Sequence, residues 1–462
     1  MPAVAKLLAC SSLAPLLLAL AGASGAAPPR NVYIKDQQFM LRATNAPIVM
    51  GGPNVVVKGP PYMPSVSGTT ICKDNTDGAC AQTGTCSSCS TFNQADVDHI
   101  KKLGWNFIRL GVVWAGAQPT DEDALDPAFV ERLHAVLNLT DINGIHVMLD
   151  NHGDMVGSQG CGNGVPTWFQ KKFVGDLIGK PLETKLPYSL IPAISVYKTG
   201  GYDHCGDNAT SWAAYAGDPN YNLLNECCQA MNSGNPGGLG FTTISQRTMD
   251  AVVNDGAGRA DFVRFWRLVA EAAAAHPSAF GFELMNEPMT IHRKSMFDAW
   301  RACAEEITAV VPDASVMIAD VGEGSVLPSW ITALSGGAED ISKDTIDWIK
   351  QSNNVFYAWH YGNEPTNVKN MQAISEKWNV PSFATETGCD QFNAAAAANI
   401  SHSYWHYSAY CNTGPDFGNR TVPDDTFGAC ILGWGSGDSS KCAPPTPAPP
   451  AAAAAATATA TM

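Results

Sequence analysis

The sequence predicts an α/β fold class, specifically a closed (β/α)8 TIM barrel with a long insertion after the third strand. Short apolar runs alternate with amphipathic stretches of helical length, which indicates repeated βαβ units and a parallel sheet. Seven such runs are evident, and the sequence leaves room for an eighth. Polar and aromatic side chains gather at the C-terminal ends of these runs, where barrel proteins build their sites. Together these features favour a barrel over an open sheet.

The composition supports a large globular core and excludes one class of partner. The chain has 462 residues, of which 45% are hydrophobic and 15% charged. Its 43 acidic residues outnumber 28 Lys and Arg, for a formal net charge of −15. Because phosphate recognition requires a basic surface, we expect no nucleic-acid partner.

Residues 1–26 are typical of a secretory signal peptide. A single Lys6 precedes an apolar run that ends in small residues suited to cleavage near Ala26. No later stretch approaches the roughly eighteen unbroken apolar residues of a membrane span. We therefore expect a secreted or lumenal protein. Four Asn-X-Ser/Thr sequons agree with that compartment, at Asn138, Asn208, Asn399 and Asn419.

The cysteines also suggest an oxidising compartment. Of 14 cysteines, only Cys10 lies in the predicted signal peptide, which leaves an odd number and so at least one that is free or paired between chains. Four of them crowd one stretch, at Cys72, Cys80, Cys86 and Cys89. That spacing could hold zinc, but in a secreted chain a disulfide-stapled loop is the favoured interpretation.

The elements are expected in the following order. Residues 31–45 form a short hairpin that closes the bottom of the barrel. The predicted strands lie within residues 48–57, 106–113, 145–151, 279–286, 314–320, 354–361 and 381–386. The eighth strand falls near either 403–410 or 430–437. Amphipathic helices are predicted at 126–143, 259–276 and 295–311.

One interval breaks this rhythm. Residues 155–255 are rich in Gly, Asn and Tyr, show little periodicity, and contain Cys161, Cys205, Cys227 and Cys228. We predict a disulfide-braced insertion on the third βα loop that walls the active site, because loops this long are usually functional or disordered. The barrel domain is expected to span 27–442, followed by a disordered Pro/Ala/Thr-rich tail at 443–462.

The tripeptide Asn-Glu-Pro occurs twice and supplies two candidate carboxylic acids, Glu287 and Glu364. A third, Glu386, ends the strand in 381–386. Two carboxyl groups about 5–5.5 Å apart can cleave a glycosidic bond with retention, one as acid/base and one as nucleophile. Glu364 lies within one βα unit of Glu386, whereas Glu287 lies three units away, enough to cross the barrel. We therefore predict that Glu287 and Glu386 form the pair.

These motifs resemble glycoside hydrolase family 5, a group of retaining β-glycosidases on (β/α)8 barrels. The resemblance rests on "FELMNEP" followed three strands later by "ATETG", with Arg109 in "FIRLGVVW", His152 in "DNHGD" and His360 on the sixth strand. Within that family the sequence is similar to the endoglycoceramidase-related group. The segments "GPNVVVKGPPYMP", "RLGVVWAGAQP", "LDNHGD" and "GCGNGVPTW" carry that likeness, which spans about 49–407.

The resemblance implies a role for each site residue. Glu287 would be the acid/base and Glu386 the nucleophile, with Asn286 on the sugar 2-OH. The remaining substrate-binding candidates are Arg109, His152, His360, Tyr361, Trp405, Lys58 and Asp154. Tyr361 departs from the family pattern, in which one residue separates the His from the Tyr. Trp434 is a second candidate for the stacking position of Trp405, and Trp114 and Trp168 are further candidates for lining the pocket.

The resulting hypothesis is a secreted retaining β-glycosidase that hydrolyses a glycosphingolipid or a related β-glucoside by double displacement. The alternative is a family 5 endo-β-glucanase acting on polysaccharide, and a third hypothesis is a non-catalytic carbohydrate- or lipid-binding protein. The mechanism implies no cofactor and no metal. The expected partner is a glycolipid or oligosaccharide substrate, with transient contact at a membrane surface, and the chain is expected to be a monomer.

Overall fold

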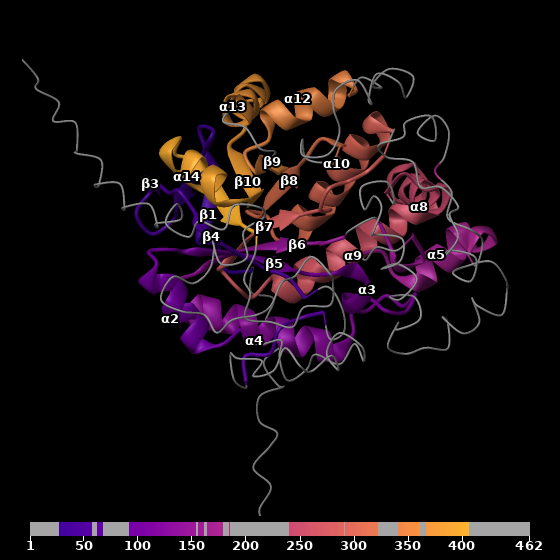
Figure 1. Ribbon diagram of the computed structural model, residues 1–462, viewed down its shortest axis with the longest axis horizontal. Coiled ribbons are helices and arrows are strands. Elements are labelled where there is room, and N and C mark those ends of the chain that lie inside the picture. Colours follow the sequence, from indigo (N-terminus) through magenta and orange to yellow (C-terminus); the bar gives the residue numbers. More distant parts are fainter. Residues whose placement is uncertain are drawn as a thin grey trace, which may run out of the picture.

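The computed structural model describes residues 27–57, 62–67, 92–153, 156–160, 164–178, 184, 240–290, 292–321, 341–360 and 366–405. These residues form a barrel of strands surrounded by helices (Figure 1). The predicted signal peptide, the cysteine-rich stretch at 72–89 and the C-terminal tail lie outside the described residues, as does most of the interval 179–239.

Eight parallel strands close into a barrel in the order β10-β11-β4-β5-β6-β7-β8-β9. This arrangement confirms the predicted barrel. Its strands are β4 Gly51–Val55, β5 Phe107–Gly111, β6 His146–Asp150, β7 Ala279–Glu283, β8 Ser315–Ile318, β9 Val355–His360, β10 Ser382–Thr387 and β11 Ser401–Tyr404. The eighth strand, β11, overlaps the first of the two predicted positions. The second position, 430–437, lies outside the described residues.

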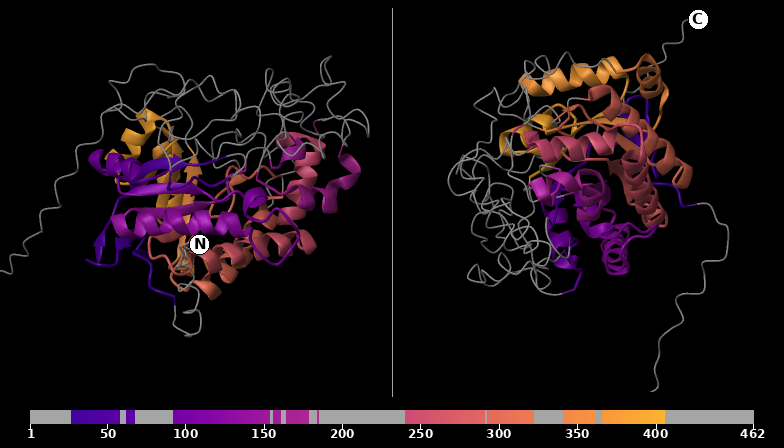
Figure 2. Two further views of the ribbon diagram at one scale, coloured as in Figure 1. Left: turned by 90° about the horizontal axis from the view of Figure 1, so that it is seen from below. Right: turned by 90° about the vertical axis from the view of Figure 1, so that its right-hand side faces the viewer.

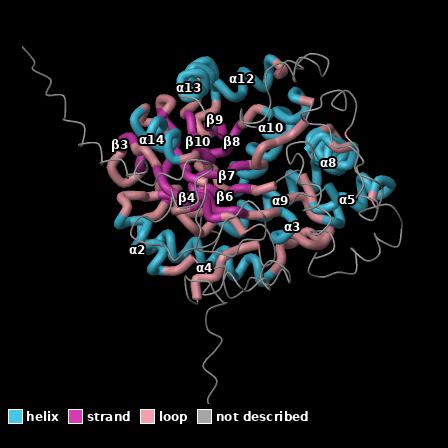
Figure 3. The backbone as a smooth tube through the Cα atoms, in the orientation of Figure 1, coloured by secondary structure: helices cyan, strands magenta, loops and turns pink. Residues whose placement is uncertain are grey.

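Helices cover the outside of the strands (Figure 3). They are α2 Gln94–Lys102, α3 Trp114–Ala117, α4 Pro127–Asn143, α5 Thr167–Val174, α8 Thr243–Val253, α9 Ala257–Ala273, α10 Arg293–Val310, α12 Lys343–Gln351, α13 Thr366–Trp378 and α14 Cys389–Ala397. The observed ends of helix α4 agree with the predicted ones, and each end has a residue that stops the helix there. Asp126 caps the N-terminus by accepting from the Phe129 amide, and Gly144 ends the helix in the left-handed conformation.

A small sheet closes the bottom of the barrel, as predicted. Strands β1 Val32–Lys35 and β2 Gln38–Leu41 pair antiparallel, and β3 Ala46–Pro47 pairs with β2. Phe39 on β2 points into the barrel, where its ring meets Phe280, Phe356 and Phe383 edge-on at centroid distances of 5.7–5.9 Å. Edge-on aromatic contacts of this kind stabilise the small sheet against the barrel, in addition to the burial of its apolar surface.

The interval between β6 and β7 is the predicted insertion after the third strand. The sequence suggested little periodicity there, but the structure contains α5 and α8 within it. These helices lie to one side of the barrel, with α5 packed on α8 and α8 on α9 (Figures 1 and 2). Cys161, Cys205, Cys227 and Cys228 lie outside the described residues, so the predicted disulfide bracing stays a prediction.

Cys303 on α10 is a free and fully buried thiol. Burial raises the pKa of its thiol far above the ordinary value, which makes the reactive thiolate scarce at neutral pH. A free cysteine agrees with the odd count in the sequence.

None of the helices in the described part of the chain combines the length and apolar character of a membrane span.

His402 on β11 should make the fold sensitive to acid. Burial lowers the pKa of its imidazole from 6.5 to about 4, although its hydrogen bond to the Ile400 carbonyl acts in the opposite direction. Because the unfolded chain binds this proton more tightly, stability is full above pH 6.5 and falls as the pH drops toward 4. We expect a loss of about 2 kcal/mol at pH 5 from this group.

The measurement is urea unfolding at pH 7 and pH 5 for wild type and His402→Asn. The Asn amide can keep the hydrogen bond to the Ile400 carbonyl but does not titrate, so the variant should lose less stability between the two pH values. The variant forfeits the ring contact with Phe392, at 4.1 Å between centroids, at both pH values. An unchanged pH dependence in the variant would contradict the assignment to His402.

Candidate active site

Strand register places a group of polar residues at one end of the barrel. Asn54 on β4 lies beside Arg109 on β5, and Asp150 on β6 lies beside Glu283 on β7. Glu386 on β10 lies beside His360 on β9. The parallel strands end at the same level, so side chains from six of the barrel's strands converge there.

Arg109 is the centre of this group and is fully buried. Its Nε and Nη2 atoms donate to the two carboxylate oxygens of Glu283 at 2.6 and 2.9 Å. Its Nη1 atom donates to Asn54 Oδ1 and to Glu386 Oε1, both at 2.7 Å. Nη2 also donates to Asn286 Oδ1 at 2.8 Å. All five N–H donors of the guanidinium are thereby matched by an acceptor.

The charge on Arg109 is strongly stabilised. Burial by itself would lower the pKa of its guanidinium, but the negative charges of Asp150, Glu283 and Glu386 raise that pKa well above the ordinary value. Asp150 Oδ1 lies 3.1 Å from Nη2. One permanent positive charge is thus surrounded by three carboxyl groups, two of them fully buried.

The two predicted catalytic glutamates meet at one histidine. His360 Nδ1 lies 3.1 Å from Glu287 Oε1 and 3.7 Å from Glu386 Oε2. These two oxygens can therefore be no further apart than the sum of the two distances, about 6.8 Å. That limit accommodates the spacing of retaining glycosidases, about 5–5.5 Å, and excludes most of the inverting range of about 6.5–9.5 Å.

Glu287 lies in the loop that follows β7 and has an unusual backbone conformation. Its φ of 40° falls in the left-handed region, which a residue with a side chain seldom adopts. Neighbouring contacts hold the loop. The Asn286 amide donates to the Asn151 carbonyl at 3.2 Å, and Gln246 Nε2 on α8 donates to the Met289 carbonyl at 3.1 Å. Strain held in this way is typical of functional loops.

His152 follows β6 and is fixed by a carboxylate and a ring. Its Nδ1 pairs with Asp150 Oδ2 at 2.8 Å, and the same nitrogen lies 3.9 Å from Glu386 Oε1. Trp405 directly follows the eighth strand, and its ring stacks on the imidazole of His152 at 5.0 Å with an interplanar angle of 11°. The structure therefore brings these two predicted residues together and places His152 next to the predicted nucleophile.

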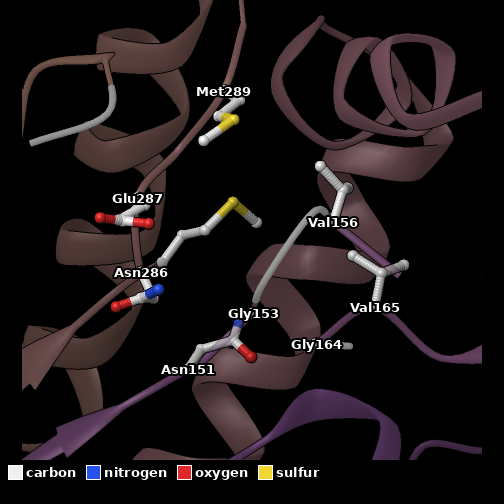
Figure 4. A pocket seen from close by; sticks show the side chains of 9 residues that line it. Asn151, Gly153, Val156, Gly164, Val165, Asn286, Glu287 and Met289 are labelled. Atoms are coloured by element: carbon white, nitrogen blue, oxygen red, sulfur yellow. The ribbon is translucent and has the colours of Figure 1, made fainter. Parts of the chain in front are cut away.

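A small apolar pocket adjoins Glu287 (Figure 4). It is lined on one side by Asn286 and Glu287, and on the other by Val156 and Val165. Met285, Met289, Asn151, Gly153 and Gly164 complete the lining. The backbone at Gly164 has a φ of 105°, and a Cβ there would lie 2.6 Å from the Cα of Gly153. Glycine therefore allows the two loops to pack closely and set the apolar wall.

Some predicted residues are not placed by the structure. Lys58, Asp154, Tyr361 and Trp434 lie outside the described residues, so their roles stay predictions. One tryptophan candidate, Trp114, was wrong, whereas the role of Trp168 stays a prediction.

Trp114 is fully buried in the core, in contact with Phe169, Phe262 and Phe265. Trp168 donates to the Gln118 carbonyl. Neither tryptophan lines the pocket beside Glu287.

Three residues of the cluster were not singled out from the sequence. Glu283, Asp150 and Asn54 are fully buried and all contact Arg109. A signal was available, because each is a polar residue in a strand whose other residues are mostly apolar. Across the described segments, no group of three or more His, Cys, Asp or Glu side chains is arranged to hold a metal ion.

Comparison with known proteins finds similarity to one family of glycosidases. Residues 72–178 match the family described as cellulase (glycosyl hydrolase family 5). An endoglycoceramidase from Cyanea nozakii is 27% identical over 239 residues, which is 51% of this chain and 37% of that protein. Endoglycoceramidase I from Rhodococcus hoagii is 23% identical across 87% of this chain and 74% of its own length. The chain is related to glycoside hydrolase family 5, and within it to the endoglycoceramidases.

A solved structure agrees with the fold. Endo-glycoceramidase II from Rhodococcus sp., in a five-membered iminocyclitol complex, has a TM-score of 0.51 and 18% identity, and the match covers 83% of this chain and 78% of that one. The family match includes Arg109 and His152, whereas Glu287 and Glu386 lie beyond it. The aligned part of the chain spans only about a third of the Cyanea nozakii protein and of a second relative, from Hydra vulgaris.

Proposed function

We propose that the protein is a retaining β-glycosidase that cleaves the bond between a sugar and the lipid of a glycosphingolipid. The observation that carries the proposal is the pair Glu287 and Glu386, which come from the fourth and seventh barrel strands and meet at His360 Nδ1. Two carboxyl groups at this separation suit double displacement through a covalent glycosyl-enzyme.

The contacts suit different roles for the two glutamates. Arg109 Nη1 donates to Glu386 Oε1 at 2.7 Å and so holds that carboxylate in place for attack on the sugar. Glu287 is placed as the acid/base, with His360 as its hydrogen-bonding partner. The oxygen of the Asn286 amide is engaged by Arg109, so its NH2 group is the part that would donate to the sugar 2-OH. Trp405, stacked on His152, offers a ring to the sugar.

The substrate class is supported by the surroundings of Glu287. An acid/base protonates the leaving oxygen, so the leaving group lies on its side of the site. There the lining includes Val156, Val165, Met285 and Met289, which suits an apolar leaving group. The cavity itself is small, about 10 Å³, close to the size of one water molecule. It would therefore receive only the first atoms of a lipid. The named relatives, which are endoglycoceramidases, agree with this choice.

The test compares hydrolysis of lactosylceramide with that of a soluble β-glucan, using wild type and Val165→Thr. The substitution keeps the shape of the side chain but puts a hydroxyl on the apolar wall. We expect kcat/KM for lactosylceramide to fall by about tenfold, which corresponds to about 1.4 kcal/mol, with little change on any soluble glycoside that is cleaved.

Val316→Thr on β8 is the matched control, since Val316 is equally buried but belongs to the core, away from this pocket. It reports the general cost of burying a hydroxyl. Cleavage of glucan but not of lactosylceramide by the wild type would overturn the lipid substrate and favour an endo-β-glucanase. Loss on both substrates in both variants would show that the pocket has no special part in recognition.

A further inference from the structure

Glu283 binds the Nε and Nη2 side of the Arg109 guanidinium, whereas the predicted nucleophile Glu386 binds Nη1. Both of its carboxylate oxygens accept from Arg109, one from Nε at 2.6 Å and one from Nη2 at 2.9 Å. A bidentate pair of this kind fixes the plane of the guanidinium as well as its position. Both side chains are fully buried, so water does not compete for these hydrogen bonds.

The two-point contact with Glu283 also sets the direction of the other N–H donors of Arg109. With Nε and one Nη2 hydrogen committed to Glu283, the Nη1 group can face only Asn54 and Glu386. The two amides give single contacts, one from Asn54 and one from Asn286. A single contact leaves the guanidinium free to turn about that bond. The two-point contact from Glu283 is the one that sets its rotation.

We infer that Glu283 is a positioning residue that acts through Arg109 to hold the Glu386 carboxylate in its reactive orientation. This inference rests on the proposed function, because the orientation of Glu386 matters for rate only if Glu386 is the nucleophile. The Glu283 carboxylate is bound to Arg109 rather than to Glu386, and its backbone carbonyl accepts from the Asn151 amide at 3.1 Å. Its influence passes through one guanidinium.

Asp150 contributes less to this orientation. Its Oδ1 lies 3.1 Å from Arg109 Nη2, and its other oxygen holds His152 Nδ1 at 2.8 Å. Asp150 therefore divides its contacts between two partners, whereas Glu283 presents both oxygens to Arg109. Substitution of Asp150 would disturb His152 as well, so Glu283 is the cleaner test.

The test is the kinetics of Glu283→Gln on two substrates, one with a poor leaving group and one aryl β-glycoside with a dinitrophenolate leaving group. Gln keeps the shape but replaces one acceptor with an NH2 group, which turns the guanidinium away from its present orientation. A misplacement of about 1 Å costs about 100-fold in rate. We expect that loss in kcat, with KM little changed.

The second substrate separates positioning of the nucleophile from acid catalysis. A dinitrophenolate leaves without a proton, so Glu287→Gln should slow attack on the poor leaving group far more than attack on the good one. Glu283→Gln should slow both alike, because both require Glu386. A loss confined to the poor leaving group, or none at all, would overturn the inference. Asp298→Asn, which removes a half-buried carboxylate on α10 paired with Lys294, is the control.

A crystal structure of Glu283→Gln gives a readout that does not depend on activity. The inference expects the Arg109 Nη1 to Glu386 Oε1 contact, now 2.7 Å, to be broken or lengthened. An unchanged contact would overturn the inference. If the wild type cleaves no glycoside, the proposed function has failed while this structure still decides the geometry. If Glu283→Gln does not fold, Glu283→Asp, which keeps the charge but shortens the reach, is measured in the same way.

Discussion

Glu386→Gln should reduce hydrolysis by on the order of 10⁴-fold or more, the scale of loss when a nucleophile is removed from a covalent mechanism. The amide can still accept from Arg109 Nη1, now 2.7 Å from the carboxylate, so folding and substrate binding should survive. What the variant lacks is the negatively charged oxygen that attacks the anomeric carbon. The measurement is the initial rate on lactosylceramide, with KM obtained where the residual rate allows.

The other Asn-Glu-Pro copy provides the matched control. Glu364→Gln makes the same chemical change in the same tripeptide, and the sequence argument gives Glu364 no catalytic part. It should retain most of the wild-type rate. Near-normal hydrolysis by Glu386→Gln would remove the nucleophile from the proposed mechanism. A large loss in Glu364→Gln instead would show that the wrong copy was chosen.

The fold could be predicted where the strands are apolar. Seven of the eight barrel strands were found because their runs stand out from amphipathic neighbours, and the helix predicted at 126–143 is observed at 127–143. The eighth strand was harder. Ser401–Tyr404 is fully buried yet contains two serines and a histidine, so no apolar run announces it. Its polar groups bond inside the barrel, as Asn54 does to Ser403.

The site was predictable in part, for a related reason. Arg109, Glu386 and His360 were identified because polar residues at strand ends are expected to line a barrel mouth. Glu283 and Asp150 were overlooked because they lie inside the predicted strands 279–286 and 145–151, although the structure ends β7 and β6 at these two residues, and because their partner Arg109 comes from another strand. Only the strand register reveals that both face Arg109. The left-handed φ of Glu287 could not be predicted either, since nothing in "MNEPM" requires it.

Arg109→Met should lower the free energy of unfolding by about 3–5 kcal/mol, the cost of breaking a buried ion pair by removing one partner. The variant would leave Glu283 and Asp150 fully buried with no guanidinium opposite them. Urea unfolding at pH 7 measures the loss. Arg30→Met is the matched control, because Arg30 is equally buried but donates mainly to backbone carbonyls of 273–279, and its carboxylate partner Asp313 is 31% exposed. It should cost less.

A double variant shows whether charge or packing causes the loss. In Arg109→Met with Glu283→Gln, the uncompensated charge of Glu283 is gone, while the space left by the guanidinium is the same. If buried charge dominates, the double variant should be more stable than Arg109→Met alone, with a coupling of about 0.5–3 kcal/mol. Additive losses would mean instead that Arg109 acts chiefly by filling space. An Arg109→Met variant within 1 kcal/mol of wild type would contradict the view that this guanidinium holds the carboxylate cluster together.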